Sequence, residues 1–263
     1  MVSAHTDRIK SVGFNVLSVA VFVFLWALIA RWQASPFFAS PQQIASGFVQ
    51  MVTEGDAEGI GLGLHLWKSI IRVFSGFGAA CVLGIPGGLF LGLFPWVYNR
   101  TRIIIEPVRF ISPIAWIPVA IVLLVGFIRY VFVIWVASFF PIFITTLWSV
   151  RQVNPININV AKVAGASRLF IIRKIVIPSI LPSIAGGMRV SLGISWMCIV
   201  AAEMIGGEMV GIGRLILKSA MVARMDLVVV GMLTIGVLGF CLNEVFIGVE
   251  KRLFRWRSAV SIE

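Results

Sequence analysis

The stretch Asn159–Pro178, NVAKVAGASRLFIIRKIVIP, is basic and lies between two long apolar runs. The residues before Gly165 favour a helix, and the glycine permits a break in it. Ser167 can cap a second helix, which is predicted over residues 168–176. The stretch therefore predicts two short helices joined at a turn and protruding towards another protein. Small residues at the bend stiffen such an element, so it can transmit a rigid-body movement to the segments that it joins.

The composition of the whole chain indicates a membrane protein. Of its 263 residues, 59% are hydrophobic and 13% are charged, and the mean hydropathy is +1.01. One soluble core cannot bury this much apolar surface, so lipid must solvate part of it. We therefore expect an integral membrane protein.

Six apolar runs are long enough to cross the hydrocarbon layer, which takes roughly 20 helical residues at about 1.5 Å each. They are Phe14–Trp32, Val73–Trp96, Ile103–Phe127, Tyr130–Val150, Ile184–Gly206 and Leu227–Val249. The runs are continuously apolar rather than alternating, which disfavours membrane strands. The first run is as long as a span and no small-residue cleavage site follows it, which disfavours a cleaved signal peptide. The predicted fold is an all-α membrane protein with six transmembrane helices.

The basic residues indicate the orientation of these helices. With the N-terminus in the cytoplasm, the inside segments carry 13 Lys and Arg, the outside segments carry seven, and Arg109 and Arg189 lie within spans. Basic residues favour the cytoplasmic side. Both termini are therefore predicted to be cytoplasmic, and so is the segment from about residue 152 to residue 178.

Several functional classes are disfavoured. The net charge of +11 comes from basic residues that flank the spans instead of forming one patch, so topology and anionic lipid explain it better than nucleic acid. Cys81, Cys198 and Cys241 lie in predicted spans without metal-ligand spacing, and His5 and His65 are too scattered for a metal site. The spans contain no cluster of His, Cys and Asp that an enzyme would need. The chain also has no GxxxxGK[ST] motif, so it cannot be its own ATPase.

No linker or internal repeat divides the chain, so residues 1–263 are predicted to form a single transmembrane domain. The sizeable external connection, Gln33–Arg72, contains Ser40 and Pro41 as an N-cap and first residue of a short amphipathic helix. This connection is interpreted as a connector rather than a binding site.

Glu106, Arg109, Arg189 and Glu203 lie inside predicted spans, where a charge costs a few kcal/mol and is seldom without a role. Glu106 and Arg109 are three residues apart and can pair on one helix face. Arg189 can extend its charged end towards the inner headgroups. Glu203 is interpreted as a fold-stabilising hydrogen-bond acceptor in preference to a solute ligand.

An ordered set of motifs resembles the inner-membrane permease subunits of binding-protein-dependent ABC importers. The EAA loop of that family is similar to the spacing of Ala161, Gly165, Ile175, Ile177 and Pro178. Further matches along the chain are Ser69, Arg72, Gly76 and Phe77; Pro113, Ala115, Trp116 and Pro118; Pro141; Pro182, Gly187 and Arg189; and the runs AAEMIGG and GIGRLI. The ending VEKRLFRWR resembles the sulfonate, taurine, nitrate and bicarbonate branch. The glutamate that begins the family's loop is replaced by Asn159.

The resemblance implies a type I (MetI-like) permease that is a conduit and not an enzyme. Its partners would be two cytoplasmic ATPase subunits, a second permease copy forming a homodimer, and a periplasmic or lipid-anchored solute-binding protein. ATP and Mg²⁺ would be bound by the ATPase, and this chain would bind no cofactor. We refer to residues 152–178 as the coupling loop. Its implied ATPase-docking residues are Ala161, Gly165, Ala166, Arg168 and Phe170, followed by Pro178. The alternative is a helix lying on anionic lipid.

The fifth predicted span is the candidate translocation path. The candidate residues are Ser191, Ser195, Trp196, Met197, Glu203 and Met204, where small residues allow close helix packing and the larger ones can form a gate. Lys68, Arg72, Arg214 and Lys218 are expected outside and would suit an anion such as a sulfonate, nitrate or bicarbonate. The rival class is an ion-coupled secondary transporter, which would have inverted repeats and buried acids. The halves of this sequence show no repeat.

Overall fold

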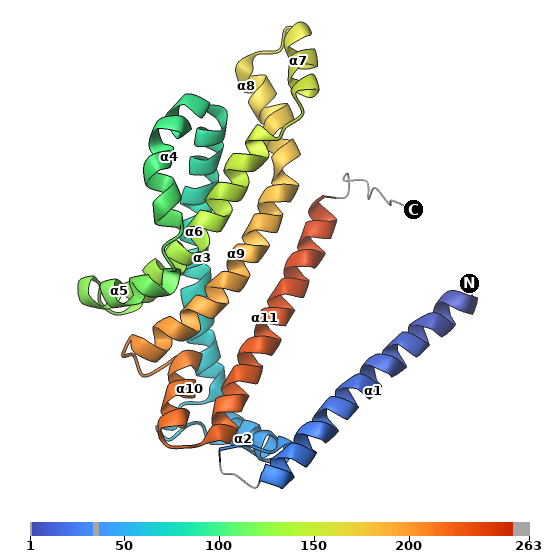
Figure 1. Cartoon of the computed structure of the whole chain (residues 1–263), viewed down its shortest axis with the longest axis vertical. Coiled ribbons are helices and arrows are strands. Elements are labelled where there is room, and N and C mark those ends of the chain that lie inside the picture. Colours follow the sequence, from blue (N-terminus) through green and yellow to red (C-terminus); the bar gives the residue numbers. More distant parts are fainter. Residues whose placement is uncertain (1, 34–36, 255–263) are drawn as a thin grey trace. The chain divides into compact units, whose positions relative to one another are not determined.

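The computed structural model describes residues 2–33 and 37–254, which form helices joined by turns (Figure 1). No strand occurs among these residues. The helices are α1 (Val2–Gln33), α2 (Pro41–Thr53), α3 (Leu62–Leu93), α4 (Pro95–Arg109), the 3₁₀-helix η1 (Pro113–Trp116), α5 (Ile117–Leu123), α6 (Phe127–Arg151), α7 (Pro155–Val163), α8 (Arg168–Ile171), the π-helix η2 (Ile172–Val176), α9 (Ile177–Ile205), α10 (Ile212–Met221) and α11 (Met225–Leu253). The family-like C-terminal motif ends at Arg257, outside the described residues.

The chain divides into two compact units. The first comprises the residues up to His65 together with Leu215–Thr234, and the second comprises Leu66–Arg214 together with the residues from Ile235 onwards. Three helices, α3, α10 and α11, run from one unit into the other.

Among the described residues, four helices are long and apolar enough to cross a membrane: Leu62–Leu93, Phe127–Arg151, Arg168–Ile205 and Met225–Leu253. A fifth crossing is formed if the bent pair Pro95–Arg109 and Pro113–Leu123 is one span. The first predicted span lies within α1, whose apolar part, Leu17–Gln33, is shorter than these. The protein is thus a multi-pass helical membrane protein with four to five spans by length and composition.

The predicted continuous helix Ile103–Phe127 is wrong. The chain bends by 84° between α4 and the following helices. Ser112, which precedes Pro113, has an extended backbone with φ −57° and ψ 132°. A residue before proline is disfavoured in the α-helical region, and Pro113 itself has no N–H to continue the helix. The proline therefore accounts for the break.

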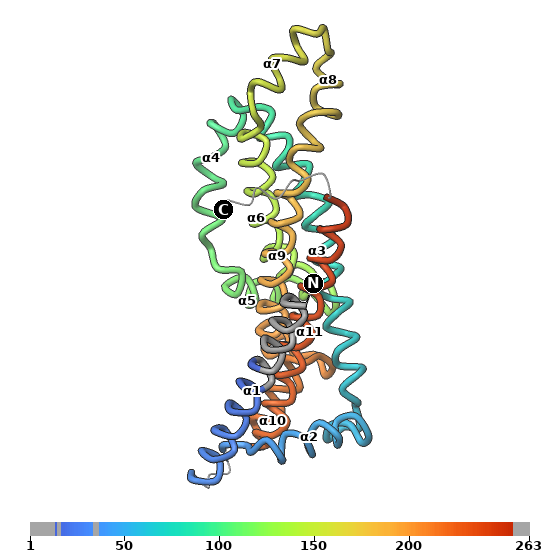
Figure 2. Tube along the Cα trace, turned by 90° about the vertical axis from the view of Figure 1, so that its right-hand side faces the viewer, coloured from blue at the N-terminus to red at the C-terminus, as the bar shows by residue number. Residues whose placement is uncertain are grey.

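The second unit has its main core between α6 and α9, which lie side by side in Figures 1 and 2. Glycines allow the close approach. A Cβ at Gly187 of α9 would lie 2.8 Å from the Cβ of Thr145 on α6, and one at Gly88 of α3 would lie 2.5 Å from the carbonyl oxygen of Phe143. Apolar helices in lipid associate through this kind of small-residue packing.

The helix after Ser167 does not end at residue 176 as predicted. Residues Arg168–Ile205 form a single 38-residue helical segment through α8, η2 and α9. The π-turn Ile172–Val176 lies directly before Pro178, which cannot make the α-helical hydrogen bond to the carbonyl of Lys174. The proline is therefore accommodated by a local widening instead of a break.

The short helix predicted after Ser40 is confirmed. Ser40 caps α2 by accepting a hydrogen bond from the N–H of Gln43, and the Gln43 side chain accepts one from the N–H of Ser40. Pro41 is the first helical residue, where its missing N–H costs nothing.

Candidate functional site

The coupling loop contains the two helices that the sequence predicted, and it projects beyond the α3–α4 turn (Figure 1). Asn154 caps α7, with its side-chain oxygen accepting from the N–H of Ile156 at 2.9 Å. Ser167 caps α8 by accepting from the N–H of Phe170. The cap at Ser167 is therefore confirmed.

The turn between these helices explains the family-like spacing of Ala161 and Gly165. The N–H of Gly165 donates to the carbonyl of Lys162 at 3.0 Å, and the N–H of Ala166 donates to the carbonyl of Ala161 at 2.9 Å. This pair of bonds is a Schellman motif, which requires the residue at Gly165 to be left-handed. Its φ is +78°, so glycine is favoured there.

The inner side of the coupling loop rests on a small apolar core. Its buried members are Val150, Ile171, Val176, Ile180 and Ile184. Ala161 and Ala166 are half-buried against this core, whereas Gly165, Arg168 and Phe170 are exposed. The structure thus gives the two alanines a position inside the turn and leaves the other three residues on its surface.

The outer surface of the coupling loop is apolar to an unusual degree. Ile156, Val160 and Val163 follow each other at spacings of four and three residues on α7, and Val163 is 90% exposed. Leu169 and Phe170 continue this surface after the turn, each more than half exposed. A short helix that packs one face on a core normally presents polar residues on the other, so this stripe marks an interaction surface.

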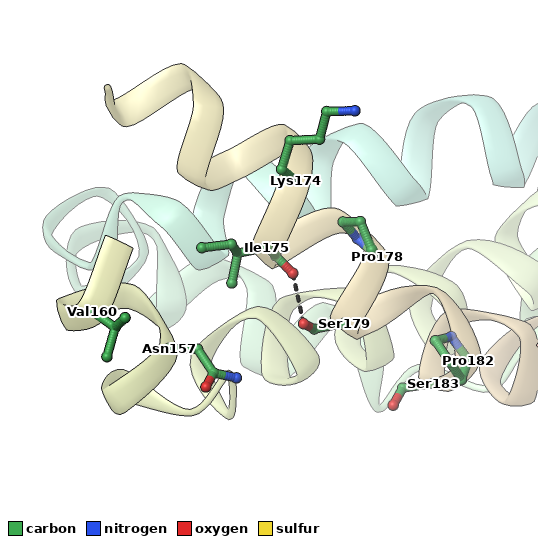
Figure 3. A pocket seen from close by; sticks show the side chains of 8 residues that line it. All are labelled: Asn157, Val160, Lys174, Ile175, Pro178, Ser179, Pro182 and Ser183. Carbon is green, nitrogen blue, oxygen red and sulfur yellow. Dashed lines mark hydrogen bonds between the residues drawn. The ribbon is translucent and has the colours of Figure 1, made fainter. Parts of the chain in front are cut away.

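A groove of about 760 Å³ separates α7 from the start of α9 (Figure 3). It is lined by Asn157 and Val160 on one side and by Lys174, Ile175, Pro178, Ser179, Pro182 and Ser183 on the other. The Ser179 hydroxyl donates to the Ile175 carbonyl at 2.6 Å, the dashed line in Figure 3. Pro178 therefore contributes to the wall of this groove rather than to the exposed stripe.

The opposite end of α9 holds a buried charge cluster. One Glu203 oxygen accepts from Arg72 Nη1 at 2.7 Å and from the Ser69 hydroxyl at 2.8 Å, and the other accepts from the N–H of Gly213 at 3.0 Å. Arg72 is 2% exposed; it also pairs with Glu208 and lies over the Tyr130 ring at 4.2 Å. Glu203 therefore accepts hydrogen bonds within the chain, as the sequence interpretation expected.

The charge cluster joins two family-like motifs that the sequence showed only separately. Ser69 and Arg72 belong to α3, and Glu203 is 131 residues after Arg72. A Cβ at Gly211 would lie 2.5 Å from the Glu203 carboxyl carbon, so the chain passes close over the cluster. The sequence did contain a signal for this pairing, namely opposite charges in two apolar segments. A buried charge needs a partner, so the two charges could have been expected to meet.

The candidate path residues do not share one surface. Ser191 donates to the carbonyl of Ser138, and the hydroxyls of Ser195 and Ser138 lie 2.5 Å apart, so both serines connect α9 to α6. Ser191, Ser195, Trp196 and Glu203 are all buried within the chain. Met197 is 75% exposed and Met204 is half-buried.

Glu106, Arg109 and Arg189 each meet an opposite charge. Glu106 and Arg109 form the predicted pair, with Nε 3.0 Å from Oε2, and the Tyr98 hydroxyl donates to Glu106. Arg189 lies 3.8 Å from Glu250 of α11.

The expected use of Arg72 for anion attraction is wrong, since its charge is buried against Glu203. In the first unit, Lys218 is 2.5 Å from Glu58 and is also paired. Among the described residues, no three His, Cys, Asp or Glu side chains are grouped as a metal site.

The structure thus combines helices long enough to cross a membrane with an exposed helical loop between two of them, as in a multi-pass membrane protein. Residues 84–257 match the family model of the binding-protein-dependent transport system inner membrane component. The chain is 34% identical over 252 residues to a putative ABC transporter permease protein of Methanocaldococcus jannaschii, covering 94% of this chain and 93% of that protein. It is 29% identical to the taurine transport system permease protein TauC of Escherichia coli, covering 97% and 96%. It is 30% identical to the nitrate import permease protein NrtB of Synechocystis, covering 89% and 86%.

The chain therefore belongs to the inner-membrane component family of binding-protein-dependent transport systems. It is a permease subunit of an ABC importer and not an enzyme, because ATP hydrolysis in these systems is performed by a separate subunit. The resemblance seen in the sequence is confirmed.

Proposed function

We propose that this chain is a six-span permease that imports a small anion with two ATPase subunits and a second copy of itself. In this assignment α1 is the first span and the bent pair α4 and α5 is the third. Three helices continue from one compact unit into the other, which supports treating residues 1–263 as one permease domain. The bias of basic residues supports cytoplasmic termini.

The exposed apolar stripe of the coupling loop is the observation that carries the proposal. Val160, Val163 and Phe170 are each more than half exposed in the described part of the chain, and the loop that carries them leads into a helical segment long and apolar enough to cross a membrane. A groove in the ATPase would cover them. Movement of the ATPase subunits would then tilt the helical segment Arg168–Ile205 and open the path to alternate sides of the membrane.

The translocation path is proposed to lie along the exposed face of α9. Ser183, Val190, Gly193 and Met197 are exposed and succeed each other at helical spacings. Of the six path residues expected from the sequence, Met197 best fits this role, with Met204 at its edge. Because one chain of this size cannot enclose a path by itself, two copies related by a two-fold axis are proposed to face each other across it.

The anion is proposed from the relatives, which are named for taurine and nitrate transport. A solute-binding protein, periplasmic or lipid-anchored, would deliver it. ATP and Mg²⁺ would be held by the ATPase, and none of the groups described here requires a cofactor of its own.

Uptake into vesicles tests the proposal. The chain, its ATPase and its binding protein are reconstituted, and uptake of labelled taurine, nitrate and bicarbonate is measured with ATP or with a proton or sodium gradient. ATP-dependent uptake of one of these anions is expected. Uptake that follows the ion gradient and needs no ATPase would instead identify a secondary transporter.

A further inference from the structure

The coupling loop lies in a part of the chain that has no acidic residue. From Pro107 to Ala202 the sequence contains neither Asp nor Glu. Within this stretch the coupling loop itself contributes four cations, Lys162, Arg168, Arg173 and Lys174. The position where the family has its leading glutamate is occupied by Asn159, so this charge is not offset there.

The four cations are exposed and have no carboxylate partner among the described residues. Arg168 lies over the ring of Phe94 at 5.1 Å. Arg72, Lys218 and Arg224, by contrast, each meet a carboxylate within 4.0 Å. Arg173 and Lys174 follow each other in the sequence, so this end of the helical segment carries two positive charges that an acidic partner can meet.

We infer that the ATPase groove for the coupling loop has an apolar floor and a rim of carboxylates that face Lys162, Arg173 and Lys174. This inference rests on the proposed docking of the loop and states its chemistry. The apolar stripe would supply contact area, and the cations would set orientation and the rate of encounter.

Lipid headgroups fit these cations less well because of the length of the helix. The segment Arg168–Ile205 has 38 residues, which at about 1.5 Å each is about 57 Å. A bilayer with its headgroups is only about 40–45 Å thick. The segment is thus longer than the membrane is thick, which leaves room for the Arg168 end to extend past the headgroups into water.

The test measures binding of the separately purified ATPase to the permease in nanodiscs. The variant is K162Q/R173Q/K174Q, and the matched control R102Q/K251Q/R252Q also removes three exposed cations that have no carboxylate partner in the described chain. The variant should bind the ATPase at least about tenfold more weakly at low salt, and its affinity should fall less steeply with KCl, because screened attractions between carboxylates and these cations are lost. The control should bind like the wild type.

Lipid composition and cross-linking separate the possible results. The same loss in neutral phosphatidylcholine and in discs with phosphatidylglycerol supports a protein partner. Unchanged affinity and salt dependence of the variant would overturn the inference. A photo-cross-linker at Val163 checks the docking itself: if it labels the ATPase while the triple variant has no effect, only the acidic rim is refuted. If it does not label the ATPase, the proposed docking fails as well.

Discussion

The two ends of the helical segment Arg168–Ile205 are built in opposite ways. At the Glu203 end, charges are buried and meet partners from α3 and from the start of α10. At the Arg168 end, cations and apolar side chains are exposed together. Groups that are satisfied inside the chain fix the fold, whereas groups that need a partner from outside mark where another protein binds. The same rigid helix connects both.

The largest expected effect is at the buried end. Arg72→Met should destabilise the protein by about 3–5 kcal/mol, because it leaves the Glu203 carboxylate buried without its cation. Thermal unfolding in detergent, followed by size-exclusion chromatography, measures this. Lys68→Met is the control, one turn away on α3 and exposed. Equal unfolding midpoints for the two variants would show that the charge cluster does not hold the fold.

Neighbouring residues in the middle of α9 should behave differently. Trp196→Ala should cost about 3–5 kcal/mol because it opens a cavity in the core shared with α6. Met197→Ala should leave thermal stability almost unchanged, as its side chain is 75% exposed, but should change the uptake rate if Met197 lines the path. Stability and ATP-driven uptake are measured for both. A stability loss at Met197 equal to that at Trp196 would refute this division.

Much of this arrangement could be predicted from the sequence, and the failures have physical reasons. Ser40 and Ser167 were identifiable because a cap is a local hydrogen bond, and Gly165 because only a few residues accept a left-handed turn. The bend before Pro113 and the continuous helix through Pro178 differ although both contain proline, since the surrounding packing decides whether the helix breaks. The pairing of Arg72 with Glu203 depends on a fold that brings distant segments together. The side chains of α9 that face α6 could not be predicted either, because this apolar run has no periodic pattern of polar residues.

A smaller effect is expected at the turn of the coupling loop. Gly165→Ala should destabilise the α7–α8 turn by about 1 kcal/mol, because alanine disfavours the φ of +78° found there. The variant permease should retain less ATPase during purification, whereas the amount inserted in the membrane should be normal. Gly78→Ala is the control: a Cβ there also meets nothing within 4 Å, but its backbone is helical. Weaker retention with Gly78→Ala as well would show that the turn geometry is not the cause.

The smallest effect is expected at a second Schellman turn, between α10 and α11. There the N–H of Arg224 donates to the carbonyl of Ser219 at 2.8 Å, and the left-handed residue is Ala223, with φ +57°. Ala223→Gly should therefore stabilise the chain by up to about 1 kcal/mol. Thermal unfolding measures the gain. A midpoint below that of the wild type would show that glycine at position 223 does not stabilise this turn. The two turns would then respond to opposite substitutions for the same reason.

Photo-cross-linking from Val163 tests the central claim most directly, because this side chain is 90% exposed at the tip of α7 and far in sequence from the buried cluster. Benzoylphenylalanine is placed there and, in a second sample, at Val245 of α11, which is also exposed. In membranes containing the whole transporter, Val163 should give an adduct with the ATPase and Val245 should not. If the probe at Val163 labels only lipid, or gives no adduct that contains the ATPase, the assignment of the Arg168 end as the docking end is contradicted.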